Sequence, residues 1–117
     1  MKINNLSIKG GNQQFADNII NQYDNAKFEK EDVELLKFVA ELETAESAKQ
    51  KIGKDIATVN NTTIAKKDQN NARNSIAQFL LDHKGDINKW AGRISKILIA
   101  SILAKYGLTL TDIGLSE

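Results

Sequence analysis

The chain has 117 residues, of which 41% are hydrophobic and 6% aromatic, with no proline, no cysteine and a formal net charge of +1. This length fits one domain with a single core. The absence of cysteine excludes disulfides, thiolate metal sites and cysteine nucleophiles, and the near-neutral charge provides no overall attraction to nucleic acid. Without proline, and with seven glycines, the composition favours long helices over a turn-rich all-β fold.

We interpret residues 1–28 as an N-terminal leader and residues 29–117 as a helical bundle domain. A brief alternation of apolar and polar residues near Leu6 indicates a short strand. The spacing of Phe15, Ile19 and Tyr23 favours a short helix after it. The leader is expected to be short and β-like at its start, and to dock Phe15 and Ile19 on the helical core. An amide-rich strand that pairs between copies is the alternative.

Residues 6–17 of the leader read LSIKGGNQQFAD. The part from Ile8 to Asp17 resembles the I-x-G-G-N-x-Q-F-A-D leaders of small adaptor and effector-associated proteins of bacterial conflict systems. No family is identified for the rest of the chain. The resemblance implies an adaptor or oligomerising module in a defence-type system, and it brings no catalytic residues with it.

Residues 29–59 are expected to form one long helix or two collinear ones. Their apolar residues recur close to a heptad spacing, but extra members widen the stripe and favour a globular bundle over a two-stranded coiled coil. Gly53 interrupts this segment. A glycine inside a helix weakens it by about 1 kcal/mol relative to alanine and would permit close approach of a neighbour.

Charge is distributed unevenly along the same segment. Residues 29–46 are mainly acidic and residues 49–67 mainly basic, which we interpret as complementary surfaces within one chain or between copies. Lys49, Lys51 and Lys54 are therefore candidate interaction residues. They also support an alternative function, a small helical nucleic-acid-binding regulator. With two arginines in the chain and no aromatic residue near the lysines, a solvated polar face is the stronger interpretation.

The paired asparagines Asn60 and Asn61, followed by two threonines that are candidates to cap the next helix, predict a break in the helical pattern. A third helix is predicted over residues 64–83, ending in a basic turn before Gly85. After the last helix, residues 107–117 are expected to add a short turn.

The densest apolar stretch, Asp86–Tyr106, is expected to be one central buried helix that ends at Gly107. Its uninterrupted apolar part, residues 97–104, is much shorter than the about 20 residues of a membrane-spanning helix. Ile87, Trp90, Ile94 and Ile97 (or Leu98) follow the three-and-four spacing of one buried face, which continues to Ser101 and Ala104. Between residues 97 and 103 the apolar residues nearly encircle the predicted helix. We therefore expect Trp90, Ile99 and Ile102 to be covered by a second copy of the chain, with the Phe15 leader as the competing cover.

The sequence offers no catalytic constellation. His83, the single histidine, lacks a nucleophile, and no Glu-x-x-His motif of a bundle metal site occurs. Gly10 and Gly11 lack the context of a phosphate-binding loop. We predict no enzyme activity, metal or cofactor. Because residues 1–11 lack the apolar region of a signal peptide, we expect a cytoplasmic location.

These observations predict an all-α fold, a bundle of about four helices with a short leader. The predicted function is that of a non-enzymatic protein–protein interaction module that forms a homo-oligomer, an adaptor or regulator in a bacterial or phage defence-type system. The candidate interaction residues are Phe15, Trp90, Ile99, Ile102, Lys49, Lys51 and Lys54.

Overall fold

The computed structural model describes residues 2–115, with side chains from residue 12 onward. Within that range the fold is all-α, with six helices, a final 3₁₀ turn and no strand. The all-α prediction is confirmed, whereas the expected count of about four helices is wrong. The elements are α1 (Lys2–Gln22), α2 (Lys30–Glu41), α3 (Glu46–Val59), α4 (Lys66–Asp82), α5 (Lys84–Ala91), α6 (Lys96–Lys105) and the turn η1 (Leu110–Ile113).

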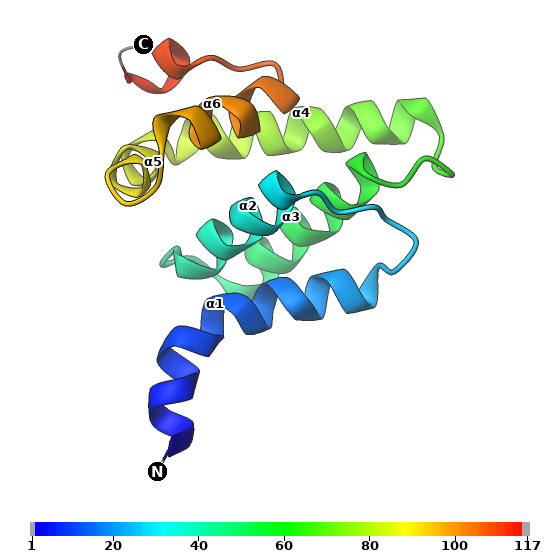
Figure 1. The fold of residues 1–117 in the computed structure, drawn as a ribbon. Coiled ribbons are helices and arrows are strands. Elements are labelled where there is room, and N and C mark those ends of the chain that lie inside the picture. The colour runs from blue at the N-terminus through cyan, green and yellow to red at the C-terminus, as the bar shows by residue number, and fades with distance from the viewer. Residues whose placement is uncertain (1, 116–117) are drawn as a thin grey trace.

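The helices lie in three tiers (Figure 1). α1 packs on α2 and α3, which form the middle tier; α3 packs along α4, and α4 lies with α5 and α6 in the third. Every helix and η1 contribute buried apolar side chains to one core. Every helix within residues 2–115 is too short or too polar to cross a membrane.

The leader is a helix, not a strand. α1 runs without interruption over Lys2–Gln22, so the expected β-like start is wrong. A strand needs a partner strand for its backbone groups, and the described chain provides none, whereas a helix satisfies its own. The expected docking of Phe15 and Ile19 is confirmed, because both side chains lie in the core beside α2 and α3.

The segment predicted as one long helix or two collinear helices is divided between α2 and α3, which pack against one another instead of lying in line. Leu42 and Ala45, at the two ends of the connection, have extended backbone with ψ near 143°. Leu42 is buried, so the chain turns inward here. The ammonium of Lys49 donates to the carbonyl of Ala40 at 2.8 Å and thereby satisfies one of the free carbonyls at the end of α2.

The predicted helix over residues 86–106 is also divided, into α5 and α6. Trp90 is buried and ends α5 against the core. Ser95 then starts a new helix with extended backbone (φ −80°, ψ 146°), and its Oγ accepts a hydrogen bond from the amide of Leu98 at 3.0 Å. A serine N-cap of this kind stabilises a helix start. The chain can thus bury both Trp90 and the inner face of α6, which a single straight helix would not do.

The break changes which face of the last helix is buried. Ile99, Ile102 and Leu103 point into the core, while Ile97, on the face that the sequence predicts to be buried, is 80% exposed. Among residues 12–115 it is the one large hydrophobic side chain that is exposed.

This reversal makes a testable prediction about stability. Replacing Ile97 with aspartate is expected to change the free energy of unfolding by no more than about 0.5 kcal/mol, because the side chain already faces solvent. Removing one methyl group from buried Ile99, as Ile99→Val, is expected to cost more, about 0.5–1.5 kcal/mol. Thermal or urea unfolding followed by circular dichroism measures both. A large loss of stability in Ile97→Asp would mean that residue 97 is buried.

The break predicted after residue 59 and the short turn predicted near the C-terminus are both present in the structure. α3 ends at Val59 and α4 begins at Lys66, so the predicted break is confirmed. The expected threonine cap of α4 is wrong, because the N-cap is Ala65. After α6, η1 is the expected short turn; it is held by reciprocal bonds between Thr109 and Asp112.

Candidate interaction surface

The candidate surface is the solvent side of α6, which we call the outer α6 face: Ile97, Ala100, Ser101 and Ala104. Ile97, Ser101 and Ala104 are exposed, and Ala100 is half-buried. The residues recur at the three-and-four spacing of one helical face. The face ends at Gly107, whose positive φ of 77° reverses the chain after the helix.

The outer α6 face carries no charged side chain along its length. The helix has lysines only at its two ends, Lys96 and Lys105. The ammonium of Lys105 contacts Asp32, a buried residue of α2. A solvent-facing helical face is normally polar and charged. The corresponding surface of α4 follows that rule, with Lys67, Asn70, Asn71, Asn74 and Gln78 exposed.

The four apolar candidates predicted from the sequence are covered by the chain itself. Phe15, Trp90, Ile99 and Ile102 are each at most 9% exposed. Trp90 stacks on the ring of Phe38 with a centroid distance of 4.5 Å. The prediction that these residues need a second copy as cover is therefore wrong. It failed because it assumed one straight helix, and the break lets two shorter helices share the available cover.

The lysine candidates have different environments. Lys49 is engaged at the end of α2, and the Lys51 ammonium contacts Asp55 at 3.0 Å and the Ser75 hydroxyl at 2.9 Å. Lys54 is exposed. Within the described residues no ion pair within 4.0 Å joins the acidic block to the basic block, and their complementarity stays a prediction. The cations that contact acidic residues of the first block are Lys37, Arg93 and Lys105.

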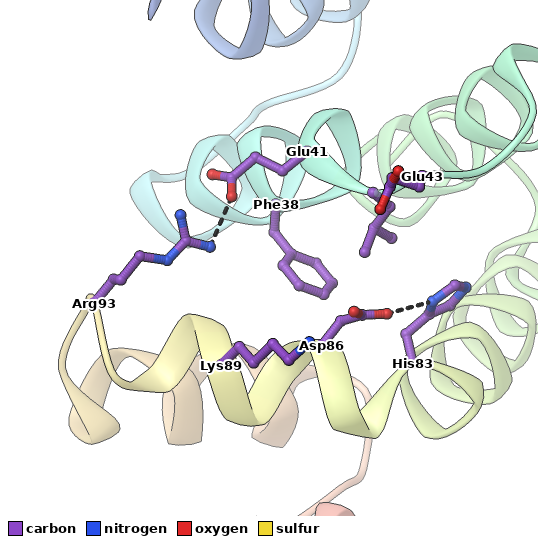
Figure 2. Close-up of a pocket in the computed structure, with 8 residues that line it drawn as sticks. Phe38, Glu41, Glu43, His83, Asp86, Lys89 and Arg93 are labelled. Atoms are coloured by element: carbon purple, nitrogen blue, oxygen red, sulfur yellow. Dashed lines mark hydrogen bonds and ion pairs between the residues drawn. The ribbon is translucent and has the colours of Figure 1, made fainter.

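A polar cavity of about 190 Å³ lies between the end of α2 and α5 (Figure 2). Arg93 and Glu41 pair across it at 2.7 Å, and His83 contacts Asp86 at 3.2 Å. The lining holds no serine, threonine or cysteine that could act as a nucleophile with His83. The geometry thus gives a polar surface depression that the Arg93–Glu41 pair bridges. Its lining residues are Phe38, Glu41, Leu42, Glu43, His83, Asp86, Lys89 and Arg93.

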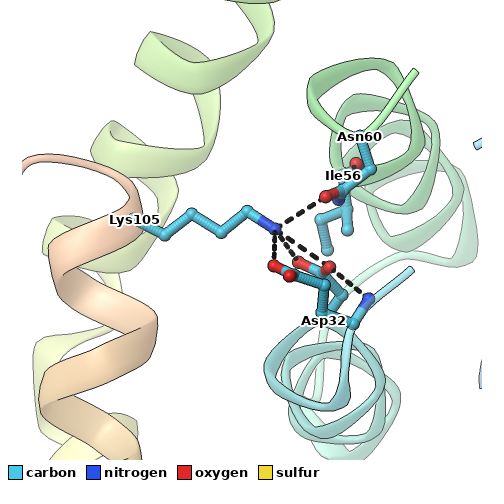
Figure 3. Close-up of polar contacts among 5 residues, drawn as sticks. Asp32, Ile56, Asn60 and Lys105 are labelled. Atoms are coloured by element: carbon cyan, nitrogen blue, oxygen red, sulfur yellow. Dashed lines mark hydrogen bonds and ion pairs between the residues drawn. The ribbon is translucent and has the colours of Figure 1, made fainter. Parts of the chain in front are cut away.

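A buried polar cluster joins the first and last parts of the chain (Figure 3). The ammonium of Lys105 lies 2.8 and 2.9 Å from the two carboxylate oxygens of Asp32 and 2.6 Å from the side-chain oxygen of Asn60. The Asp32 carboxylate is buried at 1% exposure and the Lys105 side chain is 21% exposed, so the ion pair is largely shielded from water. It fixes α6 against α2 and against the end of α3, and thereby fixes the orientation of the outer α6 face.

Tyr106 follows Lys105 and is buried, and its hydroxyl has no hydrogen-bond partner among the described residues. Burial, supported by the negative charge of Asp32 and partly opposed by Arg73, raises the pKa of this hydroxyl above its ordinary value. The phenol therefore stays protonated at physiological pH and serves as a packing group.

The described residues contain no group of three or more histidine, aspartate or glutamate side chains placed to hold a metal ion. Comparisons with protein-family models, curated proteins and solved structures find no match to this chain. The outer α6 face is the feature that sequence reasoning missed. Gly92 followed by Ser95 was the available signal, since a glycine before a serine N-cap marks the end of one helix and the start of the next.

Proposed function

We propose that this chain is a non-enzymatic protein–protein interaction module that associates with itself through the outer α6 face. The observation that carries the proposal is Ile97, 80% exposed on a face without charge. A single exposed isoleucine is ordinary on a protein surface. Here it is accompanied over two helical turns by Ser101 and Ala104, which keep the surface flat and offer no charged group to water. Such a face gains free energy when another apolar surface covers it.

The proposed setting is a cytoplasmic adaptor or regulator in a bacterial or phage defence-type system. It rests on the resemblance of residues 8–17 to conflict-system leaders. In the structure, Phe15 and Ala16 of that motif are core residues, and Gln13 donates to Asp17 at 2.8 Å along the same helix. These positions build α1 and its docking surface, which leaves α6 on the far tier available for contact.

The expected contact is weak. α6 has ten residues, or about 15 Å of helix, so the face is smaller than the interfaces of permanent dimers. The parent protein is expected to show a rise of mean mass with concentration up to roughly 100 µM, the range of transient interfaces. Light scattering coupled to size exclusion, and sedimentation equilibrium, measure this.

The Ile97→Asp variant is expected to remain monomeric over the same range while keeping the parent's unfolding temperature, because a carboxylate in an apolar contact would lose its hydration. Asn74→Asp, which adds the same charge on the exposed side of α4, is the matched control and should associate like the parent. A parent protein that is strictly monomeric at roughly 100 µM would contradict the proposal. Undiminished association of Ile97→Asp would contradict the assignment of the surface.

A further inference from the structure

We propose that two copies of the chain pair through their outer α6 faces in an antiparallel, two-fold arrangement. This inference rests on the proposed self-association and adds its geometry. A helical face packs well on its own copy when large side chains of one meet gaps on the other. The outer α6 face supplies both, since Ile97 is large and exposed, and Ser101 and Ala104 are small and exposed.

The order of large and small residues selects the orientation. With a two-fold axis between Ala100 and Ser101, an antiparallel pair places Ile97 of one copy opposite Ala104 of the other, and the same contact repeats on the other side of the axis. Each large side chain then fills the space over a small one. A parallel pair would place Ile97 against Ile97 and Ala104 against Ala104, which crowds one end and leaves a gap at the other.

Charge favours the same orientation. At the C-terminal end of α6, Lys105 contacts two carboxylates, Asp32 and the 70% exposed Glu29, so this end carries excess negative charge in addition to the negative end of the helix dipole. The N-terminal end of α6 carries the positive end of the helix dipole. An antiparallel pair brings unlike ends together, whereas a parallel pair brings like ends together.

The chain contains no cysteine, so a single introduced cysteine reports the contacts of its own position. In the antiparallel pair, Ser101→Cys places the two thiols beside the axis, where the Cα atoms can approach the about 4.4–6.8 Å that a disulfide requires. Ala104→Cys places its two thiols about seven residues apart along the helices, or about 10 Å, which prevents the bond. Both positions are exposed, and Ile97 is retained in each variant.

Each variant is incubated with oxidised glutathione at roughly 100 µM, where a weak interface is populated, and cross-linked dimer is followed on non-reducing denaturing gels. Ser101→Cys is expected to form dimer at least about tenfold faster than Ala104→Cys and than Asn74→Cys, the control on exposed α4, because pairing raises the local thiol concentration only at the axis. Equal rates for Ser101→Cys and Ala104→Cys would overturn the antiparallel geometry.

Light scattering of the parent protein distinguishes a failure of self-association from a failure of its geometry. If both α6 variants react at the control rate while the parent associates, the contact uses another surface and this inference fails, although self-association stands. If the parent does not associate, the proposed function fails and this inference with it.

Discussion

Replacing Lys105 with methionine is expected to destabilise the protein by about 3–5 kcal/mol, because the change leaves a carboxylate buried without its cation. Asp32 is 1% exposed and has the Lys105 ammonium within 2.9 Å of both of its oxygens. Methionine keeps most of the aliphatic volume of lysine, so the loss reports the missing charge. Urea unfolding monitored by circular dichroism measures the difference in free energy.

Two further variants identify the cause. In Asp32→Asn with Lys105→Met, no buried charge remains, and the amide oxygen can still accept from the Glu29 amide, as the carboxylate does at 2.8 Å. The double variant is expected to recover most of the loss. Lys51→Met removes an ammonium whose side chain is 64% exposed and should cost about 1 kcal/mol or less. Equal losses for Lys105→Met and Lys51→Met would mean that the Asp32 site is open to water.

The sequence predicted the all-α fold class because each segment carries its own local signals for helix, and the fold class follows from these segments together. Absence of proline and the three-and-four spacing of apolar residues act locally, and they indicate helix in most segments that are helical. Helix boundaries depend on tertiary contacts as well. Leu42 leaves α2 in extended conformation because its side chain is buried, and no local signal marks that position.

The buried and exposed faces of the last helix were mispredicted for a related reason. One continuous helix over residues 86–106 places Ile94, Ile97, Ser101 and Ala104 on the face of Ile87 and Trp90. The restart at Ser95 rotates α6, so that Ile97 faces solvent and Ile99 faces the core. A single boundary error thus exchanged the inner and outer faces. No sequence pattern could predict the ion pair between Asp32 and Lys105, because the two residues are 73 positions apart and meet only through the tertiary fold.

The prediction that Gly53 permits close approach of a neighbouring element is confirmed. The sequence indicated that a glycine inside a helix would let a neighbour approach closely. In the structure the neighbour is α1: a Cβ built on Gly53 would lie 2.6 Å from Cδ1 and 2.9 Å from Cγ1 of Ile19. Ile19 is fully buried, so it has little room to move. Composition and spacing could not identify which helix would occupy this space.

Replacing Gly53 with valine is therefore expected to destabilise the protein by about 3 kcal/mol, because two methyl-bearing branches would enter space that Ile19 already fills. Gly53→Ala should lose less, about 0–2 kcal/mol, since the better helix propensity of alanine offsets part of the overlap. Because α1 is the element displaced, the variants should also expose the α1–α2 connection to limited proteolysis before the rest of the chain.

A matched control and a compensating change test this cause. A Cβ added to Gly85, in α5, would meet no atom within 4 Å, and the φ of Gly85 is not positive, so Gly85→Ala should leave stability unchanged or raise it by up to about 1 kcal/mol. Ile19→Ala alone should cost about 2–5 kcal/mol through the cavity it creates. Combined with Gly53→Val it should cost less than the sum of the two single changes, since the valine fills the vacated space. Strict additivity in this cycle would show that α1 does not pack on α3 at Gly53.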